Sequence, residues 1–374
     1  MTSVGSISKR PGRPKPWRVR YRDPDGVERN RSFERRIDAQ RFLESVRSDV
    51  ITGRYVDDRK GRTTFAEYVE LWRPRQMHRP ATEQGLDQHL RRHILPTLGT
   101  RPLGVIRKSE LQAWVKGLSA TLAPATVKVS AAWVGTILRA AVDDGYLAAS
   151  PMRGIVLPKQ QRAQVVPITT EQVHTLAEHI PARYRAVILV GAGTGLRQGE
   201  LFGLTLDRVD FLARRLRVDR QLVVVKGEGP TLGPPKSEAS FRSVPLADVV
   251  LETLAEHVRV FPPGPAKYVF GDERGRPVTR SRWGVIWRPA ATVAGLDLGV
   301  GLHALRHYFA SVLIASGQSV KAVQSVLGHA SADETLNTYA HLWPDSDDRV
   351  RAALDDVFRI PAAQERPKSG PSGR

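Results

Sequence analysis

The sequence predicts a multi-domain, mainly α-helical protein with small β-sheets. At 374 residues the chain is long for a single hydrophobic core. Strict alternation of apolar and basic residues is confined to short runs, and most other apolar residues recur at helical spacing. A Pro-rich segment without periodicity interrupts the pattern. We therefore expect a β-sheet plus one helix in residues 1–60, a helical bundle in 63–150, a linker in 151–167, a mixed α+β domain in 168–360 and a disordered tail in 361–374.

The first of these parts begins with a strand pattern. Residues 17–22 alternate between an apolar face and an arginine face, residues 23–26 read as a turn, and residues 27–33 alternate again. Apolar residues then recur at helical spacing from Ala39 to Val50. This order predicts a small sheet that is backed by one helix.

Basic side chains dominate the beginning of the same part. The first 22 residues contain seven basic residues and no acidic one. We interpret this arm and the arginine face of the strand as a DNA-binding surface, although a solvated strand face is the simpler alternative for any single charge run. The expected DNA contacts are Arg13, Lys15, Arg18, Arg20 and Arg22.

Residues 63–150 read as a bundle of about four helices. Thr63 and Thr64 are good N-cap residues before an apolar stripe. Residues 109–112 fit a capping box at the start of a second helix. Pro124 suits a first helical turn and Gly145 suits a helix end. The apolar stripes of these helices are expected to form a core and not a cofactor site.

Composition limits the classes of function. The chain has 57 Lys and Arg against 38 Asp and Glu, a net charge of +19, which favours a polyanionic partner. We find no run of about 18 apolar residues and no secretory pattern at the N-terminus, so we expect a cytoplasmic protein without a membrane partner. Cysteine is absent, so disulfides, zinc–thiolate sites and thiol nucleophiles are excluded.

Seven residues in the third part form separated motifs. An arginine and a glutamate lie three residues apart at the start of a short helix, a lysine lies on a Pro/Gly hairpin between two Val-rich strands, a histidine and an arginine share one helix face, and a histidine after a glycine precedes a tyrosine by ten residues. Each has an ordinary structural interpretation on its own. In chain order they are Arg197, Glu200, Lys236, His303, Arg306, His329 and Tyr339.

A metal site is a competing interpretation of one motif. His303 and His307 have the i,i+4 spacing of a zinc helix, but a zincin requires Glu after its first histidine and this chain has Ala304. We therefore predict no metal and no cofactor. His307 is interpreted as a buried, hydrogen-bonded residue that stabilises the helix.

Together the seven residues suit phosphoryl transfer without a metal. Two arginines and two imidazoles supply cations and donors for the non-bridging oxygens. A lysine can protonate the leaving oxygen. A tyrosine hydroxyl, with an ordinary pKa of about 10, gives a workable phenolate when arginines surround it.

In order and spacing these motifs resemble the tyrosine recombinase (phage integrase) family. The resemblance implies that Tyr339 is the nucleophile and that Arg197, Arg306, His303 and His329 hold the phosphate. It also implies that His303 serves as base toward the tyrosine, that Lys236 is the general acid and that Glu200 orients Arg197. It also implies an arm-type DNA-binding domain, a SAM-like core-binding domain and a catalytic domain. Tyr339 lies ten residues after His329 where nine is more usual, and the other tyrosines near the motifs are Tyr184 and Tyr308.

The function implied by this resemblance is site-specific DNA recombination through a 3′-phosphotyrosyl intermediate, which integrates or excises a phage or mobile element. The partners implied are double-stranded attachment sites, a homotetramer on DNA, a directionality factor and a host DNA-bending protein. Two alternatives remain, a type IB topoisomerase and a catalytically silent DNA-binding regulator. An apolar stripe of Val350, Ala353, Leu354 and Val357 is expected to dock either on a neighbouring protomer or on its own domain.

Overall fold

The computed structural model describes residues 5–24, 26–52, 55–56, 59–159, 164–225, 227, 229–343 and 347–358. The chain divides into two compact units, residues 1–162 and 163–374. This division falls within the predicted linker, and the finer division into arm-type, core-binding and catalytic domains stays a prediction. The predicted tail at 361–374 lies outside the described residues.

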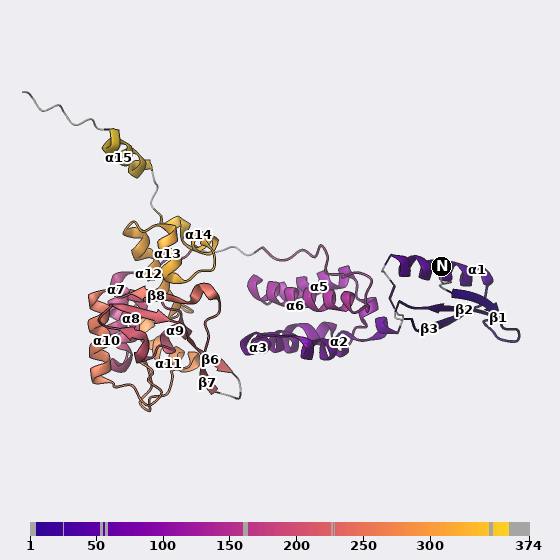
Figure 1. Ribbon diagram of the computed structural model, residues 1–374, viewed down its shortest axis with the longest axis horizontal. Coiled ribbons are helices and arrows are strands. Elements are labelled where there is room, and N and C mark those ends of the chain that lie inside the picture. The colour runs from indigo at the N-terminus through magenta and orange to yellow at the C-terminus, as the bar shows by residue number, and fades with distance from the viewer. Residues whose placement is uncertain are drawn as a thin grey trace, which may run out of the picture. The chain divides into compact units, whose positions relative to one another are not determined.

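The N-terminal unit begins with an antiparallel sheet of β1 (Gly5–Lys9), β2 (Trp17–Arg22) and β3 (Glu28–Phe33), with β2 in the centre. Helix α1 (Arg36–Ile51) packs on one face (Figure 1). Val19 of β2 is fully buried against Ala39 and Leu43 of α1, as strand alternation requires. Strand β1 was not predicted from the sequence, because its pattern is short and mostly polar.

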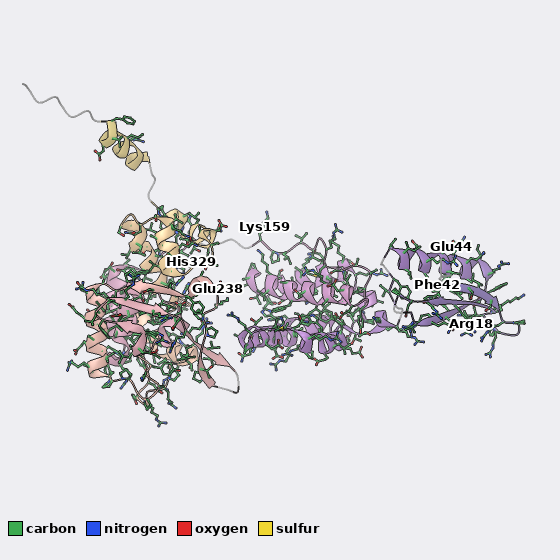
Figure 2. All side chains as sticks on the ribbon, viewed as in Figure 1. Arg18, Phe42, Glu44, Lys159, Glu238 and His329 are labelled. Carbon is green, nitrogen blue, oxygen red and sulfur yellow. The ribbon has the colours of Figure 1, made fainter. Side chains whose placement is uncertain are left out.

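The alternation in β2 separates two kinds of side chain. Trp17, Val19 and Tyr21 belong to the cluster that includes Phe42 of α1, and the arginines between them occupy the opposite face (Figure 2). Arg20 and Arg22 are exposed and Arg18 is half-buried, while Arg13 and Lys15 are exposed in the β1–β2 connection. The proposed DNA-contacting residues are therefore accessible in the described structure.

The bundle of the N-terminal unit has one hydrophobic core. Thr64 caps α2 through a complete capping box with Glu67. A π-helical turn at Leu90–Ile94 joins α3 (Pro80–His89) to α4 (Leu95–Leu98). The helices are α2 (Phe65–Trp72), α3 (Pro80–His89), α4 (Leu95–Leu98), α5 (Lys108–Ser119) and α6 (Pro124–Asp143).

The predicted capping box at residues 109–112 is wrong. The N-cap of helix α5 is Arg107, two residues before the predicted Ser109, and it makes no side-chain cap hydrogen bond. The Gln112 amide instead exchanges two hydrogen bonds with the backbone of Val156, at 2.9 and 3.0 Å. Gln112, which the local pattern assigned to the cap, is therefore hydrogen-bonded to a residue 44 positions away in sequence.

Helix α6 follows the sequence prediction. Pro124 occupies its first turn, and Gly145 follows its end with a φ of 72°. By length and composition α6 is apolar enough to cross a membrane, the one such helix among the residues described. Its stripe from Val127 to Ala141 is buried in the bundle core, which is the behaviour of a core helix.

The C-terminal unit is a helical domain with two small sheets. Helix α8 is central, and it packs against α7, α10 and α12. The sheets are β4–β5–β8 and the β6–β7 hairpin, both antiparallel. The elements are α7 (Thr170–His179), α8 (Ala182–Thr194), α9 (Gln198–Phe202), β4 (Val209–Asp210), β5 (Arg215–Val218), β6 (Gln221–Val225), β7 (Gly229–Gly233), β8 (Arg242–Pro245), α10 (Asp248–Val260), α11 (Arg280–Val293), α12 (His303–Ala315), α13 (Val320–Leu327), α14 (Ala332–Tyr339) and α15 (Asp347–Phe358).

The predicted hairpin position of Lys236 is wrong. The hairpin turn connects β6 to β7 near Gly227, whereas Lys236 lies after β7, in the connection to β8 of the other sheet. The two prolines before Lys236 cannot donate ladder hydrogen bonds, so strand pairing ends before them. Lys236 is exposed in this connection.

The apolar stripe predicted at the C-terminus lies on α15. Its residues Leu354 and Val357 are exposed, as is Phe358. The side chains of Val350 and Ala353 lie outside the described residues. Docking of this helix on a neighbouring protomer stays a prediction.

Candidate active site

Arg197 is positioned by a tight turn between two helices. Gly195 ends α8 with a φ of 63°, and a Cβ at this position would collide with the ring of Phe309. The chain then turns directly into α9, of which Arg197 is the N-cap residue. Glycine is therefore required here both for backbone conformation and for space.

Glu200 connects Arg197 to a second arginine. Its carboxylate accepts hydrogen bonds from the Arg197 backbone N–H at 2.9 Å and from the Arg197 guanidinium at 3.0 Å. The Arg242 guanidinium donates to both carboxylate oxygens, at 2.8 and 3.2 Å. Burial opposes ionisation of Glu200, but the hydrogen bonds and charges of the two arginines outweigh it and lower its pKa. Glu200 is therefore a buried anion that orients two cations.

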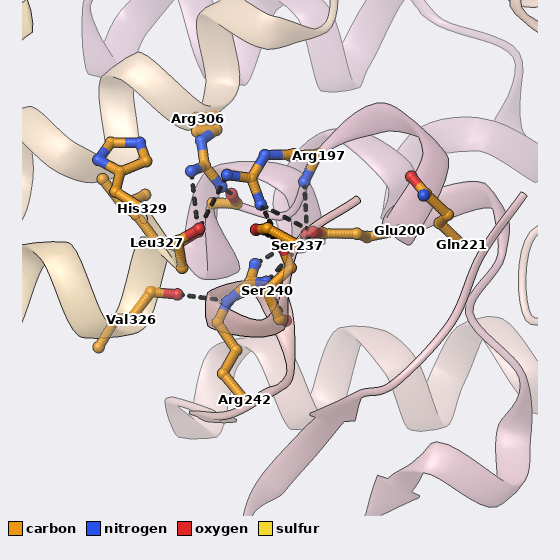
Figure 3. Close-up of polar contacts among 12 residues, drawn as sticks. Arg197, Glu200, Gln221, Ser237, Ser240, Arg242, Arg306, Val326, Leu327 and His329 are labelled. Atoms are coloured by element: carbon orange, nitrogen blue, oxygen red, sulfur yellow. Dashed lines mark hydrogen bonds and ion pairs between the residues drawn. The ribbon is translucent and has the colours of Figure 1, made fainter. Parts of the chain in front are cut away.

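Arg306 lies deeper than Arg197, with 2% of its surface exposed. Its guanidinium donates to the carbonyls of Gly195 and Leu327, each at 2.8 Å. Arg197 donates to the next carbonyl, that of Gly328, at 2.9 Å. Burial and the charge of Arg197 lower the pKa of Arg306 to about 10, so it stays cationic at neutral pH. Figure 3 shows the two guanidinium groups converging beside Leu327 and His329.

His329 is a buried neutral imidazole. Gly328 ends α13 in the left-handed conformation, and His329 follows with its Nδ1 2.8 Å from the Thr335 hydroxyl. Burial and the charges of Arg306, Arg197 and Arg242 lower its pKa to about 3. Its ring is nearly parallel to that of Tyr339, with centroids 6.4 Å apart. The spacing of ten residues therefore does not keep these two side chains apart.

Tyr339 is the last residue of α14, and only 1% of its surface is exposed. Its hydroxyl lies 2.8 Å from Nδ1 of His307. Burial raises its pKa to about 12, and the opposing effect of Arg306 does not compensate. The expectation that arginines would lower this pKa is wrong for the described structure. Burial disfavours the charged phenolate more than the positive charge of Arg306 favours it.

The two histidines at zinc-helix spacing have different surroundings. His303 begins α12 on the solvent-exposed side, and its ring packs edge-on against His307 with centroids 4.6 Å apart. Desolvation of the ring and the positive charges of its neighbours lower the pKa of His303 to about 4. His307 is half-buried and hydrogen-bonded, and its partner is the Tyr339 hydroxyl on α14.

The other tyrosines near the motifs have separate partners. The Tyr308 hydroxyl lies 3.0 Å from the Thr170 hydroxyl. Tyr184 is buried in the core of the C-terminal unit and packs edge-on against Trp283. Tyr339 is thus the tyrosine that contacts His307 and His329.

The sequence motifs do not include Arg242, which has 5% of its side chain exposed. Besides binding Glu200, it donates to the Val326 carbonyl at 2.7 Å and to the Ser240 carbonyl at 3.0 Å. Thr335, fully buried beside His329, was also missed. A strand arginine and a helical threonine carry no local signal; their partners lie up to 84 residues away in sequence.

The chain is similar to known proteins over most of its length. Residues 164–345 match the phage integrase family, and residues 64–119 match the phage integrase N-terminal SAM-like domain. The tyrosine recombinase XerC 1 of Ralstonia nicotianae is 30% identical over 62% of this chain and 72% of its own length. A XerC-like tyrosine recombinase of Caldanaerobacter subterraneus is 28% identical over 79% of this chain and 83% of its own length.

Among solved structures, the fold is similar to that of the Tn1549 transposon integrase in complex with a circular intermediate DNA. The TM-score is 0.69 at 24% identity, and the match covers 79% of this chain and 99% of that one. The arrangement of helices and small sheets in this chain is therefore an integrase fold.

Proposed function

Because the chain belongs to the tyrosine recombinase (phage integrase) family and is a site-specific DNA recombinase, we propose that Tyr339 is its nucleophile. In this proposal the Tyr339 oxygen attacks the scissile phosphate and forms a 3′-phosphotyrosyl bond, while the 5′-oxygen leaves as a hydroxyl. The bond energy stays in the protein–DNA linkage, so the reaction needs neither ATP nor another energy source.

The observation that supports this proposal most directly is the convergence of Arg197 and Arg306. Their guanidinium groups donate to the successive carbonyls of Gly328 and Leu327, at 2.9 and 2.8 Å. Both are thus held beside each other before substrate arrives. Two fixed cations suit the charge that develops on the non-bridging oxygens of a phosphodiester in the transition state.

The remaining predicted residues have roles that fit their positions. His303 and His329 supply additional donors to the phosphate, and Glu200 orients Arg197. Lys236 protonates the leaving 5′-oxygen from the connection between β7 and β8. Since Tyr339 is buried, its hydroxyl must become accessible to the DNA before it attacks.

We further propose the partners. The substrate is double-stranded DNA with attachment sites of a phage or mobile element, bound by a homotetramer with a directionality factor and a host DNA-bending protein, in the cytoplasm. Arg13, Lys15, Arg18, Arg20 and Arg22 contact arm-type DNA. The DNA-bound state of the similar Tn1549 integrase supports a DNA substrate.

The first experiment is a covalent-adduct assay with nicked suicide DNA that carries an attachment site. Tyr339→Phe removes the nucleophile, so we expect no protein–DNA band on a denaturing gel. Tyr308→Phe is the matched control, because its hydroxyl contacts Thr170 instead, and it should form the adduct at the normal rate. An adduct with Tyr339→Phe would refute the assignment. Relaxation of plasmids without a site requirement would contradict site-specific recombination.

A further inference from the structure

We propose that His307 is a catalytic residue of this recombinase, and that it accepts the proton of the Tyr339 hydroxyl as the tyrosine attacks. The inference rests on the proposed function, because it assigns a role toward the proposed nucleophile. It concerns a residue that lies outside the seven motif positions.

The geometry places His307 directly on the reacting oxygen. Its Nδ1 lies 2.8 Å from the Tyr339 hydroxyl oxygen, and the two rings pack edge-on with centroids 5.6 Å apart. The contact joins α12 to the last residue of α14, across 32 positions of sequence. A general base must lie within hydrogen-bond reach of the proton that it removes, and His307 meets this condition.

His303 fits this role less well. It precedes His307 by one helical turn, and its ring packs against the His307 ring and not against Tyr339. From the exposed start of α12, His303 is better placed to donate to the phosphate. The two histidines therefore have different roles. His303 donates a hydrogen bond to the phosphate, and His307 accepts the proton of the nucleophile.

The protonation state of His307 suits an acceptor. Burial and the charge of Arg306 lower its pKa, so the imidazole is neutral at pH 7. A neutral imidazole has one acceptor nitrogen, and with the Tyr339 hydroxyl donating, that nitrogen is Nδ1 and the ring proton lies on Nε2. The groups that face His307 are His303 and Arg306 on its own helix, Tyr339 on α14 and His329 between α13 and α14.

Binding of the DNA phosphate would strengthen this base. The phosphate anion beside Arg306 and Arg197 offsets the positive charge that disfavours the imidazolium. Proton transfer would thus be favoured when substrate is present, and the hydroxyl would stay neutral and buried when it is absent.

The step is balanced. The bond from the Tyr339 oxygen to its hydrogen breaks and the bond from Nδ1 to that hydrogen forms, while the tyrosine oxygen bonds to phosphorus and the bond from phosphorus to the 5′-oxygen breaks. Lys236 supplies the proton for the 5′-oxygen. In rejoining, a 5′-hydroxyl attacks, the imidazolium of His307 returns its proton to the tyrosine oxygen, and Lys236 is protonated again.

The test compares two reactions of His307→Asn. The asparagine oxygen can accept a hydrogen bond near the Nδ1 position but cannot act as a base. We expect cleavage of suicide DNA to fall about 100-fold or more at pH 7, and the rate to rise about tenfold per pH unit above pH 7 as hydroxide replaces the imidazole.

The second reaction does not use the tyrosine. An oligonucleotide with a 3′-p-nitrophenyl phosphate is joined to a 5′-hydroxyl strand, and p-nitrophenolate leaves without a proton. His307→Asn should join this substrate at nearly the wild-type rate, since the phosphate pocket is intact. His179→Asn on the exposed side of α7 is the matched control and should change neither reaction.

Wild-type cleavage by His307→Asn, or an equal loss of cleavage and joining, would overturn the proposal. His307→Gln provides a second variant with the same pair of readouts if His307→Asn is poorly folded. Tyr339→Phe in the covalent-adduct assay reports separately on the proposed function. If Tyr339→Phe still formed the covalent adduct, the nucleophile would be wrong, whatever His307 does.

Discussion

Buried charge is the main feature of this site at the scale of single residues. Glu200, Arg242 and Arg306 each have less than a tenth of their surface or side chain exposed, yet each is charged. An ion of this kind is stable only when its partners replace the water that it has lost. Here the partners are one carboxylate and a set of backbone carbonyls, which leaves net positive charge for a phosphate.

Arg242→Met tests this arrangement. The change removes two hydrogen bonds to Glu200 and one each to the Val326 and Ser240 carbonyls, and it leaves a buried carboxylate with one cation fewer. We expect a loss of about 3–5 kcal/mol in the free energy of unfolding, measured by urea denaturation, together with loss of adduct formation.

The matched control for Arg242→Met is Arg259→Met, which breaks an exposed pair with Glu256 on α10. Solvent screens that pair, so the unfolding midpoint should be almost unchanged. Equal effects of the two substitutions would show that the buried network does not stabilise the unit.

The buried histidines also predict how stability depends on pH. The pKa of His329 falls from about 6.5 in the unfolded chain to about 3 in the folded unit. Below pH 6.5 the unfolded state binds more protons, so stability decreases as the pH falls, by up to about 1.4 kcal/mol per pH unit from this residue.

Urea denaturation between pH 4.5 and 6.5 measures this slope. His329→Gln should reduce the slope by up to about 1.4 kcal/mol per pH unit, whereas the exposed His179→Gln should leave it unchanged. An identical pH dependence in wild type and His329→Gln would contradict the assignment of His329 as a buried neutral group.

At the scale of elements, the site depends on how helices end. Gly195 ends α8 and Gly328 ends α13, both in the left-handed conformation. These ends direct Arg197 and His329 toward the same place, and they expose the carbonyls that hold the arginines. The positions at which α8 and α13 end therefore determine where the site residues lie.

Gly328→Ala compared with Gly317→Ala separates backbone strain from loss of space. Both glycines have a positive φ, 68° and 83°. A Cβ at Gly317 meets nothing within 4 Å, while a Cβ at Gly328 would lie 2.9 Å from the Ala239 carbonyl oxygen and 3.0 Å from Arg242. Gly317→Ala should cost about 1–2 kcal/mol and keep cleavage.

Gly328→Ala should lose more stability than that, and it should lose adduct formation, because Arg242 and the neighbouring carbonyls must shift. Equal costs for the two alanines, with cleavage retained in both, would rule out a positioning role for the turn at Gly328. Thermal or urea denaturation and the adduct assay supply both readouts.

At the scale of the whole molecule, the positive charge has two proposed roles, binding of the DNA backbone and catalysis. Residues 1–62 contain 17 basic and 9 acidic residues, a surplus of 8. Such a surplus favours DNA backbone contacts and a steep dependence of binding on salt. The proposed catalytic cations, Arg197, Lys236 and Arg306, add only three charges, and their proposed role depends on where they are held and not on their number.

Arg20→Gln tests the proposed arm-type surface. Arg20 is exposed on the arginine face of β2, so its removal should weaken binding of arm-type DNA and lower the slope of log K against log salt by about 1. Arg41→Gln removes the same charge from the exposed side of α1, away from that face, and should leave the slope nearly unchanged. Equal slopes for the two variants would exclude the arginine face as the contact surface.

The sequence by itself determined the local structure and the order of the chemical motifs. The stripe of α2, the ends of α6 and the alternation of β2 follow from periodicity, because each reports which face of one element is buried. The chemistry of the two arginines and the tyrosine could be inferred from residue type, since phosphoryl transfer without a metal requires cations and an oxygen nucleophile.

Only the tertiary structure decided which groups meet and how far they are buried. It joined Gln112 to Val156, moved Lys236 from the hairpin turn to the β7–β8 connection, and brought Arg242 to Glu200. It also buried Tyr339 against His307. These contacts join residues far apart in the chain, so no local pattern records them; packing sets both the distance and the loss of water that governs each pKa.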